Sequence, residues 1–364
     1  LQGYVKYLEE HLLTFSSYTF RKDTMDAQKI KSLYQESFSA EPIFVRLDAI
    51  ADRIADIYET DHDTDVPDTT RDEIKRDLYK MAGTQNVLEL YGEFIASLKT
   101  KYPVLEHDSI SENLMYEDVF PVLLLKFMLF GRQKSRFDRI KHVIVDEMQD
   151  YSMIQYELLH FLFHCKMTIL GDIHQTVDKG GETFLEQAEE LFGQKITVIK
   201  MLKSYRSTYE ICEFCKKLCH LADTESFERH GKPPVLEECA DYGDMVARIQ
   251  SRMDGVNLSE ITNLAVICKT AAAAEKLYGA LDEKHRECCY LLGEEDAEFH
   301  EGILISSAYL VKGLEFDAVI VPEVTEEEYC SQRDRQILYI AATRALHELD
   351  VLYFGRKSPF LEDV

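Results

Sequence analysis

In the stretch HVIVDEMQD, residues 142–150, a run of apolar, mostly β-branched residues is followed by two adjacent acids, Asp146 and Glu147. A short run of this kind predicts a buried central strand of a parallel sheet. The acids then fall at the carboxyl end of the strand, the edge where open α/β sheets bind ligands. Asp146 suits a Mg²⁺ ion, which prefers oxygen ligands, and Glu147 suits the orientation of a water molecule for nucleotide hydrolysis. A solvated acidic turn is the alternative.

Composition limits the partners and the compartment. The 364 residues allow two or three domains, and 41 basic against 66 acidic residues give a net charge of −25. This charge argues against a wide electrostatic grip on a phosphate backbone and leaves room for a local basic groove or a basic protein partner. The sequence has no run of 18 apolar residues and no signal-peptide pattern, so we expect a cytoplasmic protein without membrane contact.

The nine cysteines are scattered and odd in number, which argues against the disulfide framework of a secreted protein. Cys212, Cys215 and Cys219 follow one another at steps of three and four residues, as zinc ligands on a helix could. No matching second cluster accompanies them, so buried core thiols are the preferred interpretation.

The sequence pattern up to about residue 131 is mainly helical. Ile43–Tyr58 repeats apolar residues at three- and four-residue steps, and Glu117–Phe130 is the most hydrophobic helical candidate of this region. Between them, the polar and acidic segment Thr60–Thr70 predicts a loop. Helical sequence then leads directly into the strand of residues 142–145, which predicts a helical insertion carried on an α/β domain.

Strands and helices alternate after residue 150. Met167–Leu170 is a second apolar strand that ends in GDIHQ, residues 171–175, so two polar clusters are expected on one sheet edge. From about residue 235 a new alternation is typical of a second parallel sheet. Further expected strands are Ile196–Ile199, Leu264–Cys268, Gly302–Ser306, Ala318–Val321 and Leu349–Phe354. Expected helices are Met153–Phe163, Phe184–Phe192, Tyr209–Leu221, Asp244–Ser251, Ala271–Leu281 and Arg335–Leu346.

Five short motifs follow one another in the chain: DEMQD at 146–150, GDIHQ at 171–175, KSYRST at 203–208, VKGLEFD at 311–317 and LYIAATRA at 338–345. In this order they resemble the motifs of superfamily 1 helicases of the UvrD/Rep/PcrA type, and the resemblance covers roughly residues 141–354. The segments DEMQDYSMIQYELL and MTILGDIHQ look most like the HelD or helicase IV-like branch of that superfamily.

The resemblance implies an α/β protein of the P-loop NTPase fold, with two RecA-like parallel-sheet lobes and Mg-ATP between them. We expect a helical insertion and part of the first lobe over residues 1–135. The carboxyl-terminal part of the first lobe would span residues 136–205, and the second lobe residues 206–364.

The resemblance also implies roles for the residues of the first two motifs. Asp146 would help to hold Mg²⁺, and Glu147 would activate the attacking water. Gln175 would sense the γ-phosphate of ATP and link it to the nucleic-acid track.

The later motifs complete the implied nucleotide site. Tyr205 would stack on the base and Arg206 would contact the γ-phosphate. In VKGLEFD, Gly313 would permit a tight turn and Glu315 would reach the nucleotide sugar. Arg344 would act as the second arginine finger. Two Arg residues from opposite sides of a cleft would make hydrolysis depend on lobe closure.

Two features depart from the family pattern. Tyr309 lies where the family usually has a His that contacts nucleic acid, and Tyr could stack on a base or pack on protein. No G-x-x-x-x-G-K-[ST] occurs, so the backbone cradle and Lys that bind phosphates are missing. The chain, which starts at Leu1, is therefore expected to be a fragment that begins downstream of the P-loop, with a degenerate relative as the alternative. We expect no ATP turnover by this chain alone.

Three functions remain open at this point. The leading one is an ATP-driven helicase or translocase that moves on single-stranded DNA. The second is a HelD-like ATPase that binds and recycles RNA polymerase, which the acidity and Tyr309 support. The third is an inactive scaffold, and the complete set of acids and arginines argues against it.

Overall fold

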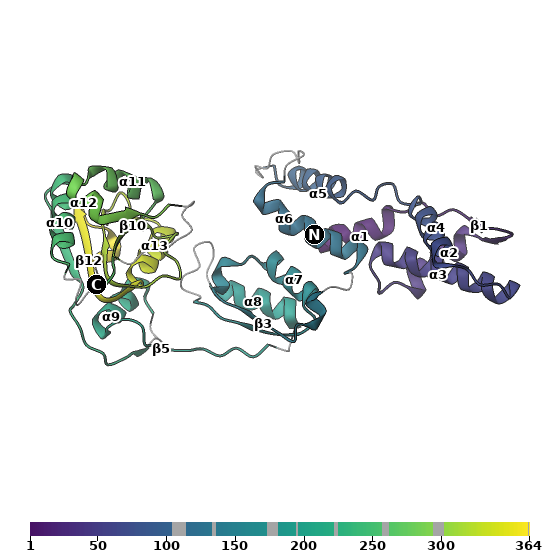
Figure 1. The fold of residues 1–364 in the computed structure, drawn as a ribbon, viewed down its shortest axis with the longest axis horizontal. Coiled ribbons are helices and arrows are strands. Elements are labelled where there is room, and N and C mark those ends of the chain that lie inside the picture. Colours follow the sequence, from purple (N-terminus) through teal and green to yellow (C-terminus); the bar gives the residue numbers. More distant parts are fainter. Residues whose placement is uncertain are drawn as a thin grey trace. The chain divides into compact units, whose positions relative to one another are not determined.

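The computed structural model describes residues 1–103, 114–132, 136–172, 181–193, 196–221, 225–256, 262–293, 302–362 and 364 (Figure 1). Two compact units are present. The first comprises residues 1–145 and 151–168, and the second comprises residues 146–150 and 169–364. None of the helices in these residues is long and apolar enough to cross a membrane.

The first unit is mainly helical. Its long helix α3 (Ile43–His62) buries Ile43, Leu47 and Ile50 completely on one face, which is the periodicity expected from the sequence. The other helices of this unit are α1 (Gln2–His11), α2 (Ala27–Ser32), α4 (Asp68–Tyr79), α5 (Val87–Lys101), α6 (Tyr116–Phe130) and α7 (Met153–Leu162). A short hairpin joins β1 (Tyr18–Phe20) to β2 (Asp23–Met25), and a π-helix spans Leu33–Ser37.

The loop predicted between α3 and α4 is shorter than Thr60–Thr70, because α3 continues to His62 and α4 begins at Asp68. Arg71 on α4 joins the two helices, with its guanidinium 2.8 Å from Asp56 Oδ1 and 3.0 Å from Glu59 Oε2. These ion pairs link α4 to the last turns of α3 across the short loop.

The strand with the acids is less buried than its sequence predicts. β3 (His142–Val145) pairs with β4 (Lys166–Ile169) in a two-stranded sheet, where His142 Nε2 lies 2.8 Å from Thr168 Oγ1. Val145 is buried, but Ile144 is 69% exposed. Side chains of a strand alternate between its two faces, so a sheet covered on one face exposes every second residue. The prediction of a buried central strand is therefore wrong for the described residues.

The second unit is built on a six-stranded sheet whose paired strands are all parallel, as the sequence predicts. The strand order is β7-β12-β11-β8-β10-β9. Its strands are β7 (Val235–Cys239), β8 (Leu264–Cys268), β9 (Cys289–Leu291), β10 (Ile303–Ser307), β11 (Phe316–Val321) and β12 (Ala345–Phe354). Every residue of β8 is buried, as befits a central strand of a sheet covered on both faces.

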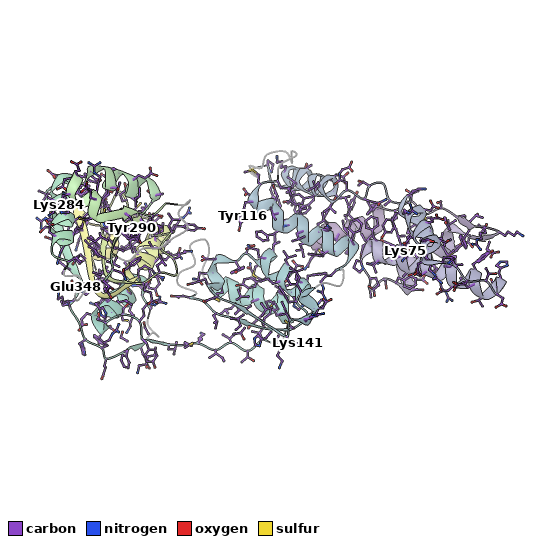
Figure 2. All side chains as sticks on the ribbon, in the orientation of Figure 1. Lys75, Tyr116, Lys141, Lys284, Tyr290 and Glu348 are labelled. Atoms are coloured by element: carbon purple, nitrogen blue, oxygen red, sulfur yellow. The ribbon has the colours of Figure 1, made fainter. Side chains whose placement is uncertain are left out.

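Helices cover both faces of this sheet. Ala265 and Ile267 of β8 pack with residues of α9 (Tyr209–Cys219) and α13 (Gln332–Ala342). The alternate residue Val266 packs instead with α10 (Tyr242–Asp254) and α11 (Ala271–Ala280). Figure 2 shows the side chains of this unit, with Lys284 on α12 (Glu283–Cys288), Tyr290 on β9 and Glu348 on β12. The arrangement is the doubly wound α/β architecture expected from the alternating pattern.

One predicted strand is absent, and one predicted helix ends early. Residues 196–199 are irregular rather than a strand, and Ile199 is 81% exposed because no neighbouring strand pairs with them in the described part of the chain. The last helix ends at Ala342 rather than Leu346, and β12 begins at Ala345. Arg344 therefore lies in the tight connection between α13 and β12.

The cysteines of α9 behave as core residues. Cys212 and Cys215 are buried, and burial raises the pKa of the Cys215 thiol well above its usual value. In the residues that the structure describes, no group of three or more His, Cys, Asp and Glu side chains is placed to hold a metal ion.

Candidate functional site

Asp146 and Glu147 lie in a tight turn directly after β3. The backbone N–H of Glu147 donates to Asp146 Oδ1 at 2.9 Å, and the Gln149 amide donates to Glu147 Oε2 at 2.5 Å. Glu147 has a φ of 51°, in the left-handed region that residues with a side chain rarely adopt. Such strained residues cluster at functional sites. The turn leaves Asp146 exposed and Glu147 half-buried, so both carboxylates are accessible from solvent.

The second polar cluster packs against this turn. Met148 N donates to the Leu170 carbonyl at 2.9 Å, and Asp172 N donates to Gln149 Oε1 at 3.1 Å. The two acid-containing turns therefore lie together, as the sequence predicts. Gln175, the predicted γ-phosphate sensor, lies outside the described residues.

Gly171 allows this close approach. A Cβ atom at this position would lie 2.4 Å from Met148 Cγ and 2.6 Å from the Met148 backbone nitrogen. We expect Gly171→Ala to lower the free energy of unfolding by about 1–3 kcal/mol, because the turn must move to admit the methyl group. Chemical denaturation measures this change. Gly279→Ala is the matched control, since Gly279 lies in α11 and a Cβ atom there would meet nothing within 4 Å.

The control is expected to stabilise the protein by about 0.5–1 kcal/mol, because Ala has the higher helix propensity. A free energy of unfolding that stays unchanged or rises in Gly171→Ala, as in the control, would contradict a close contact between the two turns.

The VKGLEFD motif follows β10 and reaches the same acids. Gly313 has a φ of +78°, and a Cβ atom there would lie 4.0 Å from Glu147 Oε1. The Lys312 ammonium lies 2.5 Å from Asp150 Oδ1, and the Lys312 side chain is only 14% exposed. Lys312 therefore fixes the Gly313 turn to the last acid of DEMQD. The neighbouring Tyr309 ring, 5.4 Å from Lys312 Nζ, is 73% exposed.

Arg206 and Glu315 form an ion pair with each other. Arg206 Nε lies 2.5 Å from Glu315 Oε1, and both side chains are 42% exposed. A pair this exposed contributes only about 0–1 kcal/mol to stability. It can therefore be exchanged for a ligand at little cost, with phosphate oxygens taking the place of the carboxylate on Arg206.

Arg344 is almost completely buried, with 1% of its surface exposed. Its guanidinium donates to the Ile340 carbonyl at 3.2 Å and to the Leu314 carbonyl at 3.3 Å. Burial lowers the pKa of Arg344, the Arg206 guanidinium lowers it further, and the Glu147 and Glu315 carboxylates oppose both effects. Through the Leu314 carbonyl, Arg344 holds the turn that carries Glu315.

Tyr205 projects from a two-stranded parallel ribbon. β5 (Lys203–Ser204) pairs with β6 (Glu225–Ser226), which places the ring of Phe227 5.3 Å from the ring of Tyr205. Lys203 Nζ lies 5.8 Å from the Tyr205 ring centre and 5.4 Å from the Phe227 ring centre. Tyr205 is 62% exposed, so its ring remains available for stacking on a planar ligand.

Several residues of this site have no role that the sequence pattern predicts. Gln149 and Lys312 lie inside recognised motifs, but only the folded chain shows that they join one motif to another. Tyr339 in LYIAATRA donates to Asp172 Oδ2 at 3.4 Å, and burial together with the Asp172 carboxylate raises its pKa. Phe227 has no sequence signal, because its partner Tyr205 is brought to it by the β5–β6 ribbon.

Two family models match the chain. The UvrD/REP helicase N-terminal domain matches residues 15–177, and the UvrD-like helicase C-terminal domain matches residues 302–352. The fold and these matches define a helicase-domain protein. The two matches support a UvrD/Rep-type superfamily 1 helicase.

Individual relatives are distant or partial. A protein of Acanthamoeba polyphaga mimivirus named "Putative ATP-dependent DNA helicase" is 24% identical over 247 residues, which are 59% of this chain and 34% of that protein. The chain thus spans about a third of the length of this relative. The C-terminal domain of a possible DNA helicase from Lactobacillus plantarum is 34% identical, over 44% of this chain and 94% of that one, with a TM-score of 0.38. A PRRSV helicase is 12% identical over 74% of this chain and 46% of its own, with a TM-score of 0.32, too low to bear on function.

Proposed function

We propose that this chain is part of an ATP-dependent superfamily 1 DNA helicase or translocase, in which Mg-ATP hydrolysis drives movement on single-stranded DNA. The observation that carries the proposal is the meeting of separate motifs at one place in the second unit. The strained turn of Asp146 and Glu147 adjoins the Gly313 turn, and the Lys312–Asp150 ion pair joins the two. A scaffold would not require this convergence of carboxylates and arginines.

The residues present fit a magnesium nucleotide. Mg²⁺ is usually held by one or two carboxylates together with phosphate and water oxygens, and the exposed Asp146 carboxylate can supply such a ligand. The ion would neutralise charge that develops on the phosphates. Glu147, held by the Gln149 amide, would accept a proton from the attacking water.

The remaining residues would bind and orient the nucleotide. Tyr205 would stack on the base with its exposed ring, and Glu315 would reach the sugar once Arg206 has turned from it to the γ-phosphate. Gln175 would report the state of the γ-phosphate to the nucleic acid. Arg344 would stabilise the transition-state charge, since phosphoryl transfer depends mainly on positioning and on compensating charge.

The 364 residues contain no G-x-x-x-x-G-K-[ST] motif of the kind that forms a phosphate-binding loop. We infer that this chain alone does not turn over ATP, because no backbone cradle and Lys hold the β- and γ-phosphates. The chain spans about a third of its viral relative, so the test belongs to the full-length protein.

A second candidate is a HelD-like ATPase that remodels or recycles RNA polymerase. The net charge of −25 favours it, since such a surface repels nucleic acid and attracts basic proteins. Steady-state ATP turnover by the full-length protein separates the two. Stimulation by single-stranded DNA supports the helicase. Stimulation by RNA polymerase with no response to DNA supports the second candidate and overturns the first.

A further inference from the structure

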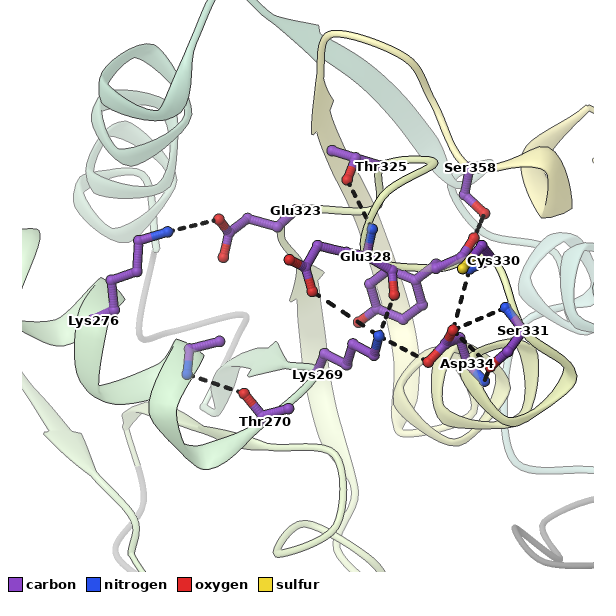
Figure 3. Close-up of polar contacts among 12 residues, drawn as sticks. Lys269, Thr270, Lys276, Glu323, Thr325, Glu328, Cys330, Ser331, Asp334 and Ser358 are labelled. Atoms are coloured by element: carbon purple, nitrogen blue, oxygen red, sulfur yellow. Dashed lines mark hydrogen bonds and ion pairs between the residues drawn. The ribbon is translucent and has the colours of Figure 1, made fainter.

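Lys269 lies at the carboxyl end of β8, the central strand of the six-stranded sheet, and its ammonium is enclosed by groups from the α13 region (Figure 3). It forms an ion pair with Asp334 Oδ1 at 2.8 Å and donates to the Glu328 carbonyl. It also lies 5.4 Å from the centre of the buried Tyr329 ring. The Lys269 side chain is 22% exposed and that of Asp334 11% exposed, so both charges are largely removed from water.

Asp334 lies in the first turn of α13, as the third residue of the helix after its cap residue Ser331. Its Oδ2 accepts hydrogen bonds from Ser331 N at 2.9 Å, Ser331 Oγ at 2.7 Å and Cys330 N at 3.2 Å. Ser331 Oγ in turn accepts from Asp334 N at 3.2 Å, which completes a capping box. With Oδ1 engaged by Lys269, both carboxylate oxygens serve the protein itself. These contacts therefore hold the first turn of α13 in place. We call the cluster the α13 anchor; it consists of Lys269, Glu328, Tyr329, Ser331 and Asp334.

The negative charge of Asp334 stabilises the α13 anchor. Burial would raise the pKa of Asp334, but hydrogen bonds from Lys269, Ser331 and the Cys330 amide outweigh it and lower the pKa to about 2. A carboxyl whose pKa is depressed on folding stabilises the folded state above its unfolded pKa. The contribution of Asp334 is therefore complete near neutral pH and is lost as the pH falls from about 4 towards 2.

The other end of α13 reaches the candidate site. Tyr339, on the last turns of α13, donates to Asp172 Oδ2 at 3.4 Å. Arg344 follows the helix and holds the Leu314 carbonyl at 3.3 Å, while the Arg344 carbonyl accepts from Phe316 N at 2.9 Å. A regular helix transmits a displacement of its first turn to its last, because its backbone hydrogen bonds and buried side chains make it move as a rigid body.

We propose that Lys269 is a positioning residue: through Asp334 it fixes the start of α13, and through α13 it fixes Tyr339 and Arg344 relative to the turns that carry Glu147 and Glu315. The proposal rests on the proposed function for its effect on turnover. The effect of Lys269 on the position of α13 does not depend on that function. A displacement of about 1 Å at reacting groups can cost about 10²-fold in rate, so a loose anchor is expected to lower kcat.

Local hydrogen exchange of this 364-residue chain, followed by mass spectrometry, tests the structural step. Lys269→Met is expected to speed exchange of peptides covering residues 330–345 about tenfold or more, while peptides from β7 and α10 stay unchanged. Lys276→Met is the matched control. Lys276 lies in the same region and pairs with Glu323 at 3.1 Å, but it does not touch α13 (Figure 3). The control is expected to leave exchange of residues 330–345 as in the unchanged protein.

Lys269→Arg keeps the positive charge, so residues 330–345 are expected to keep most of their protection against hydrogen exchange. Faster exchange throughout the second unit would indicate general unfolding and overturn a local positioning role. Unchanged exchange in residues 330–345 would overturn it as well.

ATP turnover by the full-length protein tests the effect of Lys269 on catalysis. Lys269→Met is expected to lower kcat for ATP about 10- to 100-fold with KM within a few-fold, Lys269→Arg to recover much of kcat, and Lys276→Met to match the unchanged protein. A fall in kcat/KM carried by KM alone would contradict the proposal. If the unchanged protein shows no turnover, the proposed function fails, and the exchange experiment still decides the role of Lys269.

Discussion

Replacing Glu147 with Gln in the full-length protein is expected to lower kcat for ATP by about 10²- to 10⁴-fold, the usual contribution of a positioned general base. The substitution keeps the size and shape of the side chain, so the turn should persist. An amide oxygen at this position can still accept from the Gln149 amide, as Glu147 Oε2 does at 2.5 Å. It cannot take a proton from water. Nucleotide binding should therefore survive while turnover is lost.

Steady-state turnover and equilibrium ADP binding together measure this separation. Glu326→Gln is a suitable control, because Glu326 is an exposed acid of the second unit that pairs with Arg356 at 3.5 Å, away from the motifs. The control should retain full turnover. Turnover unchanged in Glu147→Gln would remove Glu147 from the role of base. Loss of binding in parallel with turnover would instead mean that the strained turn had collapsed.

Arg344→Ala is expected to reduce turnover by about 10³-fold or more, in line with the contribution of an arginine finger. It should also destabilise the fold. The Leu314 and Ile340 carbonyls lose a donor in a buried position, and each unsatisfied buried group costs about 1–3 kcal/mol. Removal of the side chain also leaves a cavity, because Arg344 is 1% exposed.

Arg344→Lys separates the two effects. It keeps the positive charge and most of the volume but loses the planar fork that serves two carbonyls at once. Denaturant unfolding gives the change in stability, which should be smaller for Lys than for Ala, and turnover should still fall by a large factor. Full turnover in a stable Arg344→Lys protein would contradict a role that needs the guanidinium. Equal loss of binding and turnover would indicate structural damage alone.

The sheet of the second unit could be predicted from the sequence because its strands are continuous apolar runs. β8 and β11 are buried on both faces, as an apolar run such as LAVIC, residues 264–268, predicts. The same prediction is wrong for Ile144, which is exposed, and for residues 196–199, which form no strand. The sequences around these residues are also largely apolar, but burial and strand formation depend on neighbours, which a local pattern does not contain.

The candidate site was predictable only in its parts. The acids and arginines of the motifs are visible in the sequence, and the adjacency of the first two polar turns follows from successive strands. No local pattern indicates the contacts that join residues far apart in the chain. These are the Lys312–Asp150 ion pair, the Tyr205–Phe227 ring contact and the Lys269–Asp334 ion pair of the α13 anchor. The roles of the individual side chains and the domain boundaries at residues 135 and 205 remain predictions.

The most direct measurement of the central claim is a calorimetric titration of this 364-residue chain with Mg-ATP, run beside a turnover assay. The sequence contains no G-x-x-x-x-G-K-[ST] motif, and we propose that its carboxylates, its arginines and the Tyr205 ring form the rest of a nucleotide site. We therefore predict weak or undetectable binding and no turnover. Tight binding with turnover would show that another segment of this chain holds the phosphates, and it would contradict the account of a site that is complete only in the full-length protein.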